Sequence, residues 1–202
     1  MIYKEEKRDL FSVPDDYYLA HCISADFKMG AGIAVEFNKR FDMKNILQTK
    51  HSDYIGMWHH YKFIGDCLEE GRVLNLITKE RYYQKPTYAS MESALIQMLY
   101  CCEELNIKKI AMPIIGCGLD KLEWDKVSEL IKKVFDNTDI EILVCIKDIK
   151  NIPKKPIVRQ HYDCTSVYYT WQCPTCNNEW LKEKPQKCAK CGQFIDWSKN
   201  DK

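Results

Sequence analysis

The sequence lacks any uninterrupted apolar run long enough to cross a membrane as a helix. Residues 1–7 also lack the apolar segment of a signal peptide. An excess of charge is missing as well, because 30 lysines and arginines face 29 acidic residues. A net charge near zero provides no overall electrostatic attraction to nucleic acid or to a membrane surface. These absences favour a cytoplasmic protein with no membrane partner.

Cysteine, in contrast, is abundant. The chain has 202 residues, the length of one medium domain or of one domain with a small module, and 11 of them are cysteines. Four cysteines cluster near the C-terminus with metal-binding spacing. The other seven lie mostly in apolar contexts, where reduced thiols packed as small hydrophobic groups explain them better than disulfides do. These seven are Cys22, Cys67, Cys101, Cys102, Cys117, Cys145 and Cys164.

The four clustered cysteines predict a structural zinc site. They form two Cys-x-x-Cys pairs separated by eleven residues, a spacing that lets both pairs close on one tetrahedral ion. Two disulfides or four free thiols are the alternatives. Because protein groups would fill all four positions, the metal is not expected to take part in catalysis, and no catalytic cofactor is predicted. The expected ligands are Cys173, Cys176, Cys188 and Cys191.

The composition of the chain changes after residue 147. Residues 147–156 are basic and contain two prolines, which is typical of a linker. We therefore expect a first domain over 1–147, a linker over 148–168 and a small zinc ribbon over 169–202. The ribbon is too short for a core of its own, so its aromatic residues should pack only if a metal holds them.

Apolar patterning in the first domain alternates between strand and helix. Helical periodicity is clear after Thr87 or Ser90, either of which can cap a helix, and again over 123–135. Alternating strands and helices predict an α/β fold with a mostly parallel sheet covered on both faces. In such folds ligands bind beyond the carboxyl ends of the strands, where loops 24–32, 78–81 and 113–120 should gather. Strands are expected over 17–23, 63–68, 73–77, 109–112 and 140–146, and a further helix over 33–41.

Two glycine turns each lie between a predicted strand and a predicted helix. Gly30 and Gly32 precede the helix over 33–41, and Gly116 and Gly118 follow the strand over 109–112. Glycine permits positive φ, so backbone N–H groups can point toward an anion near a helix N-terminus. Asp120 on the second turn would repel phosphate, which favours a role in chemistry or in binding a sugar hydroxyl. A merely tight connection is the alternative for this turn.

Residues 1–147 resemble a macro domain, most closely the branch of the terminal ADP-ribose protein glycohydrolase. The matching segments occur in the same order and with matching gaps along nearly the whole region. They are Asp9–Phe11, Ala20–Ser24, Met29–Ala34, Leu76–Lys79, Lys85–Tyr88, Met112–Pro113 and Ile115–Asp120.

This resemblance implies a three-layer α/β/α fold and an ADP-ribose site. Asp9 would bind the adenine amine, Ser24 and the first glycine turn would hold the distal ribose and diphosphate, and the second turn would close over the diphosphate. The implied binding residues are Asp9, Leu10, Cys22, Ile23, Ser24, Met29, Gly30, Ala31, Gly32, Ile33, Thr78, Ile115, Gly116, Cys117, Gly118 and Leu119.

The same resemblance implies that Lys79 is a nucleophile toward the distal ribose C1″ and that Asp120 is its acid–base partner. A lysine amine attacks only when neutral, so a nucleophilic lysine needs a lowered pKa, usually from burial. A neighbouring carboxylate acts in the opposite direction, so the site must balance the two effects. A lone lysine would otherwise be read as a surface residue. His21 lies in a predicted strand and could suggest a catalytic histidine, but we expect it to be a core histidine with its hydrogen bonds satisfied.

Three functions follow from these observations. The first is a hydrolase that removes ADP-ribose from an acidic side chain or a similar acyl or nucleotide attachment. The second is a non-catalytic module that only binds ADP-ribose or a related metabolite, which would not need the Lys79–Asp120 pair. The third is a hydrolase acting on ADP-ribosylated nucleic acid, with the ribbon contacting nucleic acid or protein. The ribbon lysines are Lys182, Lys184, Lys187 and Lys190, although a solvated rim around zinc also explains them.

Overall fold

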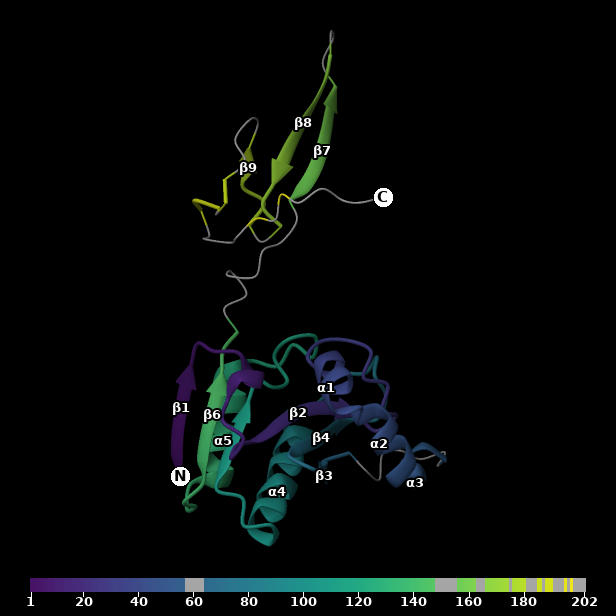
Figure 1. Ribbon diagram of the computed structural model, residues 1–202, viewed down its shortest axis with the longest axis vertical. Coiled ribbons are helices and arrows are strands. Elements are labelled where there is room, and N and C mark those ends of the chain that lie inside the picture. The colour runs from purple at the N-terminus through teal and green to yellow at the C-terminus, as the bar shows by residue number, and fades with distance from the viewer. Residues whose placement is uncertain are drawn as a thin grey trace. The chain divides into compact units, whose positions relative to one another are not determined.

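The computed structural model describes residues 1–56, 64–147, 156–162, 166–174, 176–180, 185–186 and 188–190, together with Ile195 and Trp197. The chain forms two compact units, residues 1–147 and 148–202 (Figure 1). Among the described residues, no helix is both long enough and apolar enough to span a bilayer.

The first unit is built on a six-stranded sheet with the order β1-β6-β5-β2-β4-β3. Five strands run parallel, and β3 pairs antiparallel with β4 at one edge. The predicted mixed, mostly parallel sheet is therefore confirmed. The strands are β1 Ile2–Glu6, β2 Tyr18–Ser24, β3 Asp66–Glu70, β4 Val73–Lys79, β5 Lys109–Met112 and β6 Glu141–Cys145.

Helices cover both faces of this sheet. Alternate residues of β4 divide between two cores, because successive side chains of a strand point to opposite faces. Leu74 and Leu76 pack with helices α4 and α5, whereas Val73 and Ile77 pack with α1 and α2. The three-layer architecture is visible in Figure 1. The helices are α1 Ala34–Phe41, α2 Met43–Lys50, α3 Ser52–Gly56, α4 Tyr88–Glu104 and α5 Trp124–Phe135, with a short 3-10 turn η1 over Leu10–Ser12.

Helix α4 shows how local sequence sets these elements. Thr87 caps its N-terminus by accepting from the backbone N–H of Ser90, and the Ser90 side chain accepts from the Thr87 N–H, which completes a capping box. Met91, Leu95 and Met98 are fully buried at helical spacing. The predicted helix is thus confirmed, and it ends before Leu105, which is 46% exposed.

Two features of the sheet differ from expectation. Strand β1 was not predicted, because its charged sequence shows little apolar alternation; its pairing with β6 at the sheet edge supplies the stabilising contacts. The hairpin turn between β3 and β4 lies at Gly71 and Arg72, later than expected, and β3 begins at Asp66 instead of at Phe63, which lies outside the described residues.

The second unit contains a three-stranded antiparallel sheet of β7 Ile157–Tyr162, β8 Val167–Gln172 and β9 Glu179–Trp180. Strand β7 and the start of β8 lie within 148–168, the segment expected to be a linker. That expectation was wrong for residues 157–162, because six cross-strand pairs with β8 give this short segment a partner that its own sequence does not reveal.

His21 is fully buried in β2, as expected of a core histidine. Its ring stacks on Phe37 with centroids 3.8 Å apart, and its Nε2 lies 2.8 Å from Oδ1 of Asn75. Within the described residues, Nδ1 has no hydrogen-bond partner. Burial lowers the pKa of His21 to about 4, so the ring is neutral at physiological pH.

Acidification should therefore destabilise the first unit through His21. Between pH 6.5 and about 4 the unfolded chain binds a proton at this histidine and the folded chain does not, so stability falls as pH falls. From pH 7.5 to 5 this amounts to about 2 kcal/mol of unfolding free energy. Urea titrations at both pH values should show it, and His21→Gln, which does not titrate, should lose that part. An equal pH dependence in the variant would contradict the assignment.

Candidate active site

The central strands β2, β4 and β5 are parallel, so their carboxyl ends lie at one edge of the sheet. A cavity of about 600 Å3 opens there. Ser24 at the end of β2 pairs with Lys79 at the end of β4, after a register shift that follows Ile23. The loops after all three strands line the cavity. Its lining residues are Cys22–Ser24, Lys28–Ala34, Lys79, Tyr82–Lys85, Pro113–Gly116 and Gly118–Asp120.

Lys79 and Asp120 meet in this cavity. The Nζ of Lys79 lies 2.5 Å from Oδ1 of Asp120, and the two side chains are 13% and 14% exposed. Strand β4 delivers the lysine, and the loop after β5 delivers the aspartate. An amine and a carboxylate that can exchange a proton are thus in contact at one wall of a solvent-accessible cavity.

The loop carrying Asp120 is shaped by Gly116. Its φ of +71° lies in the left-handed region, and the N–H of Leu122 donates to its carbonyl at 2.9 Å, closing a turn around residues 116–122. A Cβ at Gly116 would lie 2.6 Å from the Met91 methyl and 3.1 Å from Cδ1 of Leu122. A side chain at this position is therefore incompatible with the observed turn.

Gly116→Ala should lower the unfolding free energy by about 1–2 kcal/mol from the left-handed backbone alone, with a further loss from the contact with Met91. Gly118→Ala is the matched control, since a Cβ there meets nothing within 4 Å. Its effect should stay within about 0.5 kcal/mol. Urea unfolding of both variants measures the difference, and equal stabilities would show that Gly116 tolerates a side chain.

The first glycine turn faces the second across the cavity. Gly32 also has a positive φ, and a Cβ on it would lie 3.6 Å from Cδ1 of Leu119. Phe27 and Met29 adopt left-handed φ values of 49° and 46° although neither is glycine. Burial of both side chains stabilises this conformation. The predicted gathering of the two glycine turns is thus what the structure shows.

A third loop, residues 80–87, joins the other two. The carboxylate of Asp26 accepts from the Ser24 hydroxyl at 2.6 Å and from the Tyr82 N–H at 3.3 Å. The Lys85 ammonium donates to the carbonyl of Leu119, beside Asp120. Tyr82 and Tyr83, which are 59% and 70% exposed, line the cavity. This loop therefore connects both glycine turns and adds an aromatic rim.

Two thiols, one lining the cavity and one on the loop that carries Asp120, are poor nucleophiles. Burial raises the pKa of Cys22 to about 12, and the negative charge of Asp120 adds to the effect. Burial and the same carboxylate raise the pKa of Cys117 to about 11. Because the thiolate is the reactive form, both cysteines are protonated and unreactive near neutral pH. Lys79 is therefore a better candidate nucleophile than either cysteine.

The cavity includes most of the residues expected to bind ADP-ribose, but four of them do not line it. Asp9 caps η1 by accepting from the Phe11 N–H at 3.3 Å, and Leu10 is buried in the core. Thr78 is buried, and the Cys117 thiol donates to the Ile115 carbonyl at 3.2 Å. Their roles stay predictions. Sequence reasoning did not assign eight lining residues to the site, although three of them lie within the predicted loops and the others follow shortly after a loop: Lys28, Ala34, Tyr82, Tyr83, Gln84, Lys85, Pro113 and Ile114.

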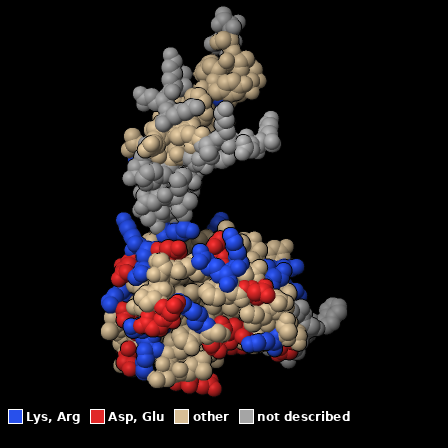
Figure 2. Space-filling view, in the orientation of Figure 1, with Lys and Arg blue, Asp and Glu red and all other residues tan. Residues whose placement is uncertain are grey.

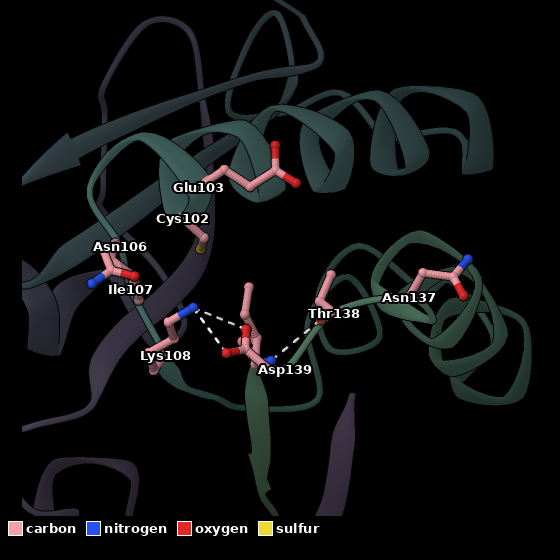
Figure 3. A pocket seen from close by; sticks show the side chains of 9 residues that line it. Cys102, Glu103, Asn106, Ile107, Lys108, Asn137, Thr138 and Asp139 are labelled. Carbon is pink, nitrogen blue, oxygen red and sulfur yellow. Dashed lines mark hydrogen bonds and ion pairs between the residues drawn. The ribbon is translucent and has the colours of Figure 1, made fainter.

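A second cavity, of about 470 Å3, lies at the opposite ends of the strands, where the chain enters β5 and β6 (Figure 3). Lys108 and Asp139 form an ion pair there at 2.9 Å, with both side chains more than half exposed. Exposed ion pairs of this kind contribute little to stability, and both charged groups remain accessible to solvent. This cavity therefore offers no counterpart to the Lys79–Asp120 pair.

Three of the four predicted zinc ligands converge in the second unit. The Sγ atoms of Cys173, Cys176 and Cys188 all lie within 4.8 Å of one another, and those of Cys176 and Cys188 are 3.7 Å apart. Four thiolates at 2.3 Å around a tetrahedral zinc ion would be separated by about 3.8 Å. The donor set and spacing thus fit zinc. Cys191, the fourth predicted ligand, lies outside the described residues.

Comparison with known proteins agrees with this architecture. The family model described as "Macro domain" matches residues 20–131. The chain is 43% identical over 141 residues to the ADP-ribose glycohydrolase OARD1 of Homo sapiens, covering 68% of this chain and 87% of that protein. The chain belongs to the macro domain family. The family match covers the strands, turns and loops that form the Lys79–Asp120 cavity and does not extend into the second unit.

More distant relatives share the macro domain fold. The DNA ADP-ribosyl glycohydrolase of Mycobacterium tuberculosis is 24% identical over 134 residues, which cover 64% of this chain and 38% of that protein. The solved macrodomain of Mycobacterium tuberculosis DarG superposes with a TM-score of 0.62 at 21% identity, covering 71% of this chain and 97% of that one. Thermosipho africanus DarTG in complex with ADP-ribose gives 0.60 at 20% identity, covering 75% and 43%.

Proposed function

We propose that this macro domain is an ADP-ribosyl hydrolase that releases ADP-ribose from an acidic side chain or a similar acyl attachment. The contact between Lys79 and Asp120 inside a cavity walled by two glycine turns carries this proposal. Relatives named as ADP-ribose glycohydrolases support a hydrolase. The glycine turns would present backbone N–H groups to the diphosphate, as the resemblance implies.

The reaction begins with a proton transfer. Lys79 Nζ donates to Asp120 Oδ1, and transfer of that proton leaves a neutral amine. The amine then forms a bond to the distal ribose C1″ while the bond from C1″ to the acyl oxygen breaks, and the carboxylate departs with the electron pair. The departing carboxylate takes the proton that Asp120 holds, which restores the Asp120 carboxylate. Water then replaces Lys79 on C1″ while Asp120 accepts the water proton, and transfer of that proton to the freed amine restores the Lys79–Asp120 ion pair. The products are ADP-ribose and the free acid.

A release assay on three defined linkages tests the proposal. Glutamate-linked ADP-ribose carries a stable carboxylate leaving group and should be hydrolysed fastest, whereas the serine-linked ether has a poor leaving group and should remain intact. Thymidine-linked ADP-ribose is the third substrate. Chromatographic detection of free ADP-ribose measures each rate. Turnover of the serine linkage alone, or of none of the three, would contradict an acyl hydrolase.

A non-catalytic ADP-ribose reader is the first alternative. Such a module needs the glycine turns but has no use for a confined amine and carboxylate in contact. Titration calorimetry that detects ADP-ribose binding, combined with no release from any of the three linkages, would favour the reader.

ADP-ribosylated nucleic acid is the second alternative substrate, and the aromatic rim favours it. Tyr82 and Tyr83 line the cavity while more than half exposed, so they are placed to stack on a planar base attached at C1″. The Mycobacterium relatives named DNA ADP-ribosyl glycohydrolase are consistent with such a substrate. Release from thymidine exceeding release from glutamate would favour this alternative.

We further propose that the second unit binds one structural zinc ion. Cys173, Cys176 and Cys188 would hold it, with Cys191 as the fourth ligand. Cys173 begins a tight turn in which the Asn177 N–H donates to its carbonyl at 2.9 Å, which supports convergence of the first pair. Zinc would cross-link the small core that Cys173, Cys176 and Cys188 form with Trp180, Ile195 and Trp197.

A further inference from the structure

The hairpin of β7 and β8 has two unlike faces. Directly paired residues of antiparallel strands point to the same side, so the register places Val158 with Trp171, Gln160 with Tyr169, and Tyr162 with Val167 on one face. We call these six residues the aromatic face. The opposite face carries Arg159, His161, Tyr168, Thr170 and Gln172, together with Ile157.

The opposite face is occupied by its own polar contacts. Arg159 Nε donates to Gln172 at 2.6 Å, and Nε2 of His161 lies 2.8 Å from the Thr170 hydroxyl. The His161 ring stacks on Tyr168 with centroids 5.1 Å apart. These contacts explain why polar residues occur there, and they leave the two faces chemically distinct.

Two of the three rings of the aromatic face are exposed to solvent, whereas the third, Trp171, packs edge-on against Trp197 with centroids 6.0 Å apart. Tyr162 is 75% exposed, Tyr169 is 49% exposed, and the flanking Val158 and Val167 are 58% and 49% exposed. The described atoms of this unit are mostly uncharged, as Figure 2 shows for one side. Exposed apolar side chains that share one face of a hairpin can mark an interaction site.

Charge in the surrounding sequence indicates the kind of partner. Residues 148–202 contain 10 of the 30 basic residues and only 6 of the 29 acidic residues, so the near-neutral chain carries its positive excess in this unit. The net charge of residues 148–202 remains positive when four cysteine thiolates and one divalent metal ion are included. Three lysines, at 150, 154 and 155, immediately precede β7 in sequence. An anionic partner is therefore favoured over a neutral one.

We propose that the aromatic face binds single-stranded nucleic acid. Exposed rings on neighbouring strands of a small sheet can each stack on one unpaired base, and the positive net charge of residues 148–202 would attract the phosphate backbone. The Gln160 amide, beside Tyr169, can hydrogen-bond base edges. This activity goes beyond hydrolysis: the second unit would hold a strand whether or not that strand carries ADP-ribose.

Fluorescence anisotropy of the full-length protein with labelled single-stranded DNA and RNA 20-mers tests the proposal. Tyr162→Ala and Tyr169→Ala should each weaken binding about fivefold or more, the lower end of the range for losing one stacked base. Tyr168→Ala is the matched control, because its tyrosine adjoins Tyr169, is 40% exposed and lies on the opposite face. It should change affinity less than twofold, and Tyr169→Phe, which keeps the ring, should bind as the parent does.

Readouts beyond affinity separate this proposal from the others. Binding should weaken steeply with salt, and Lys79→Ala should bind the same oligonucleotides unchanged, so failure of the hydrolase proposal leaves this result intact. Equal losses in Tyr168→Ala and Tyr169→Ala, or none in either, would overturn the assignment. Variants that dissociate a dimer in sedimentation velocity without changing oligonucleotide affinity would assign the face to a second copy of the chain and overturn it as well.

Discussion

Lys79→Ala is expected to reduce release of ADP-ribose by about a hundredfold or more, because it removes the group proposed to form the bond to C1″. Asp120→Ala should cause a loss of about 10²–10⁴, the range for a positioned acid–base group. Both variants should still bind ADP-ribose, because backbone N–H groups of the glycine turns, and not these side chains, are proposed to hold the diphosphate. Release kinetics and titration calorimetry on the same preparations measure the two effects separately.

Lys108→Ala is the matched control for this experiment. It breaks a lysine–aspartate ion pair of similar length in the same unit, but one that is exposed at the opposite ends of the strands (Figure 3). Its release rate should equal that of the parent. Full turnover in both site variants would refute the mechanism even if ADP-ribose still bound, and an equal loss in Lys108→Ala would point to a general effect on folding.

Cys173→Ser is expected to abolish zinc binding, lowering the metal content from about one ion per chain to near zero. Structural zinc contributes about 10–16 kcal/mol of apparent binding free energy in small metal-dependent units. The described core of the second unit is correspondingly small, so loss of the metal should unfold it. Tryptophan emission should then shift to longer wavelength, since Trp180 and Trp197 pack against the cysteines.

Metal analysis of purified chain and of Cys173→Ser measures this effect, with Cys101→Ser as the control. Cys101 is a half-buried free cysteine in α4 of the first unit, so its replacement should leave the zinc content unchanged. ADP-ribose binding should persist in Cys173→Ser, because the Lys79–Asp120 cavity is formed by residues of the first unit. Parent protein that contains no zinc, or a variant that retains it, would contradict the site.

Much of the first unit was predictable because its signals are local. Helices α4 and α5 follow a helical apolar period, and the Thr87 cap is a short-range hydrogen bond. Strand β1 escaped prediction because a charged edge strand gains its stability from pairing with β6, in which Ile2 pairs with Glu141, 139 positions away. The β7–β8 hairpin was missed for a similar reason, since its basic, proline-bearing flank is typical of a linker.

The candidate site likewise combines features that could be expected from the sequence with features that only the structure shows. Resemblance to a known family, not periodicity or spacing, paired Lys79 with Asp120. The structure places their charged atoms in contact, and it adds the aromatic rim of Tyr82 and Tyr83, which lies just beyond the predicted 78–81 loop. Asp9 was expected at the adenine and instead lies outside the cavity lining, so its role awaits a test with bound ligand.

Composition, apolar periodicity and two glycine turns were enough to establish an α/β unit with its ligand loops at one sheet edge, followed by a four-cysteine module, because these properties depend on neighbouring residues. No local pattern determined that an amine and a carboxylate 41 positions apart would touch, which only the family resemblance implied, or that three tyrosines of a short hairpin would be exposed; the tertiary structure decided both. Strand order and register create both arrangements, and they depend on pairing between segments that no local pattern specifies.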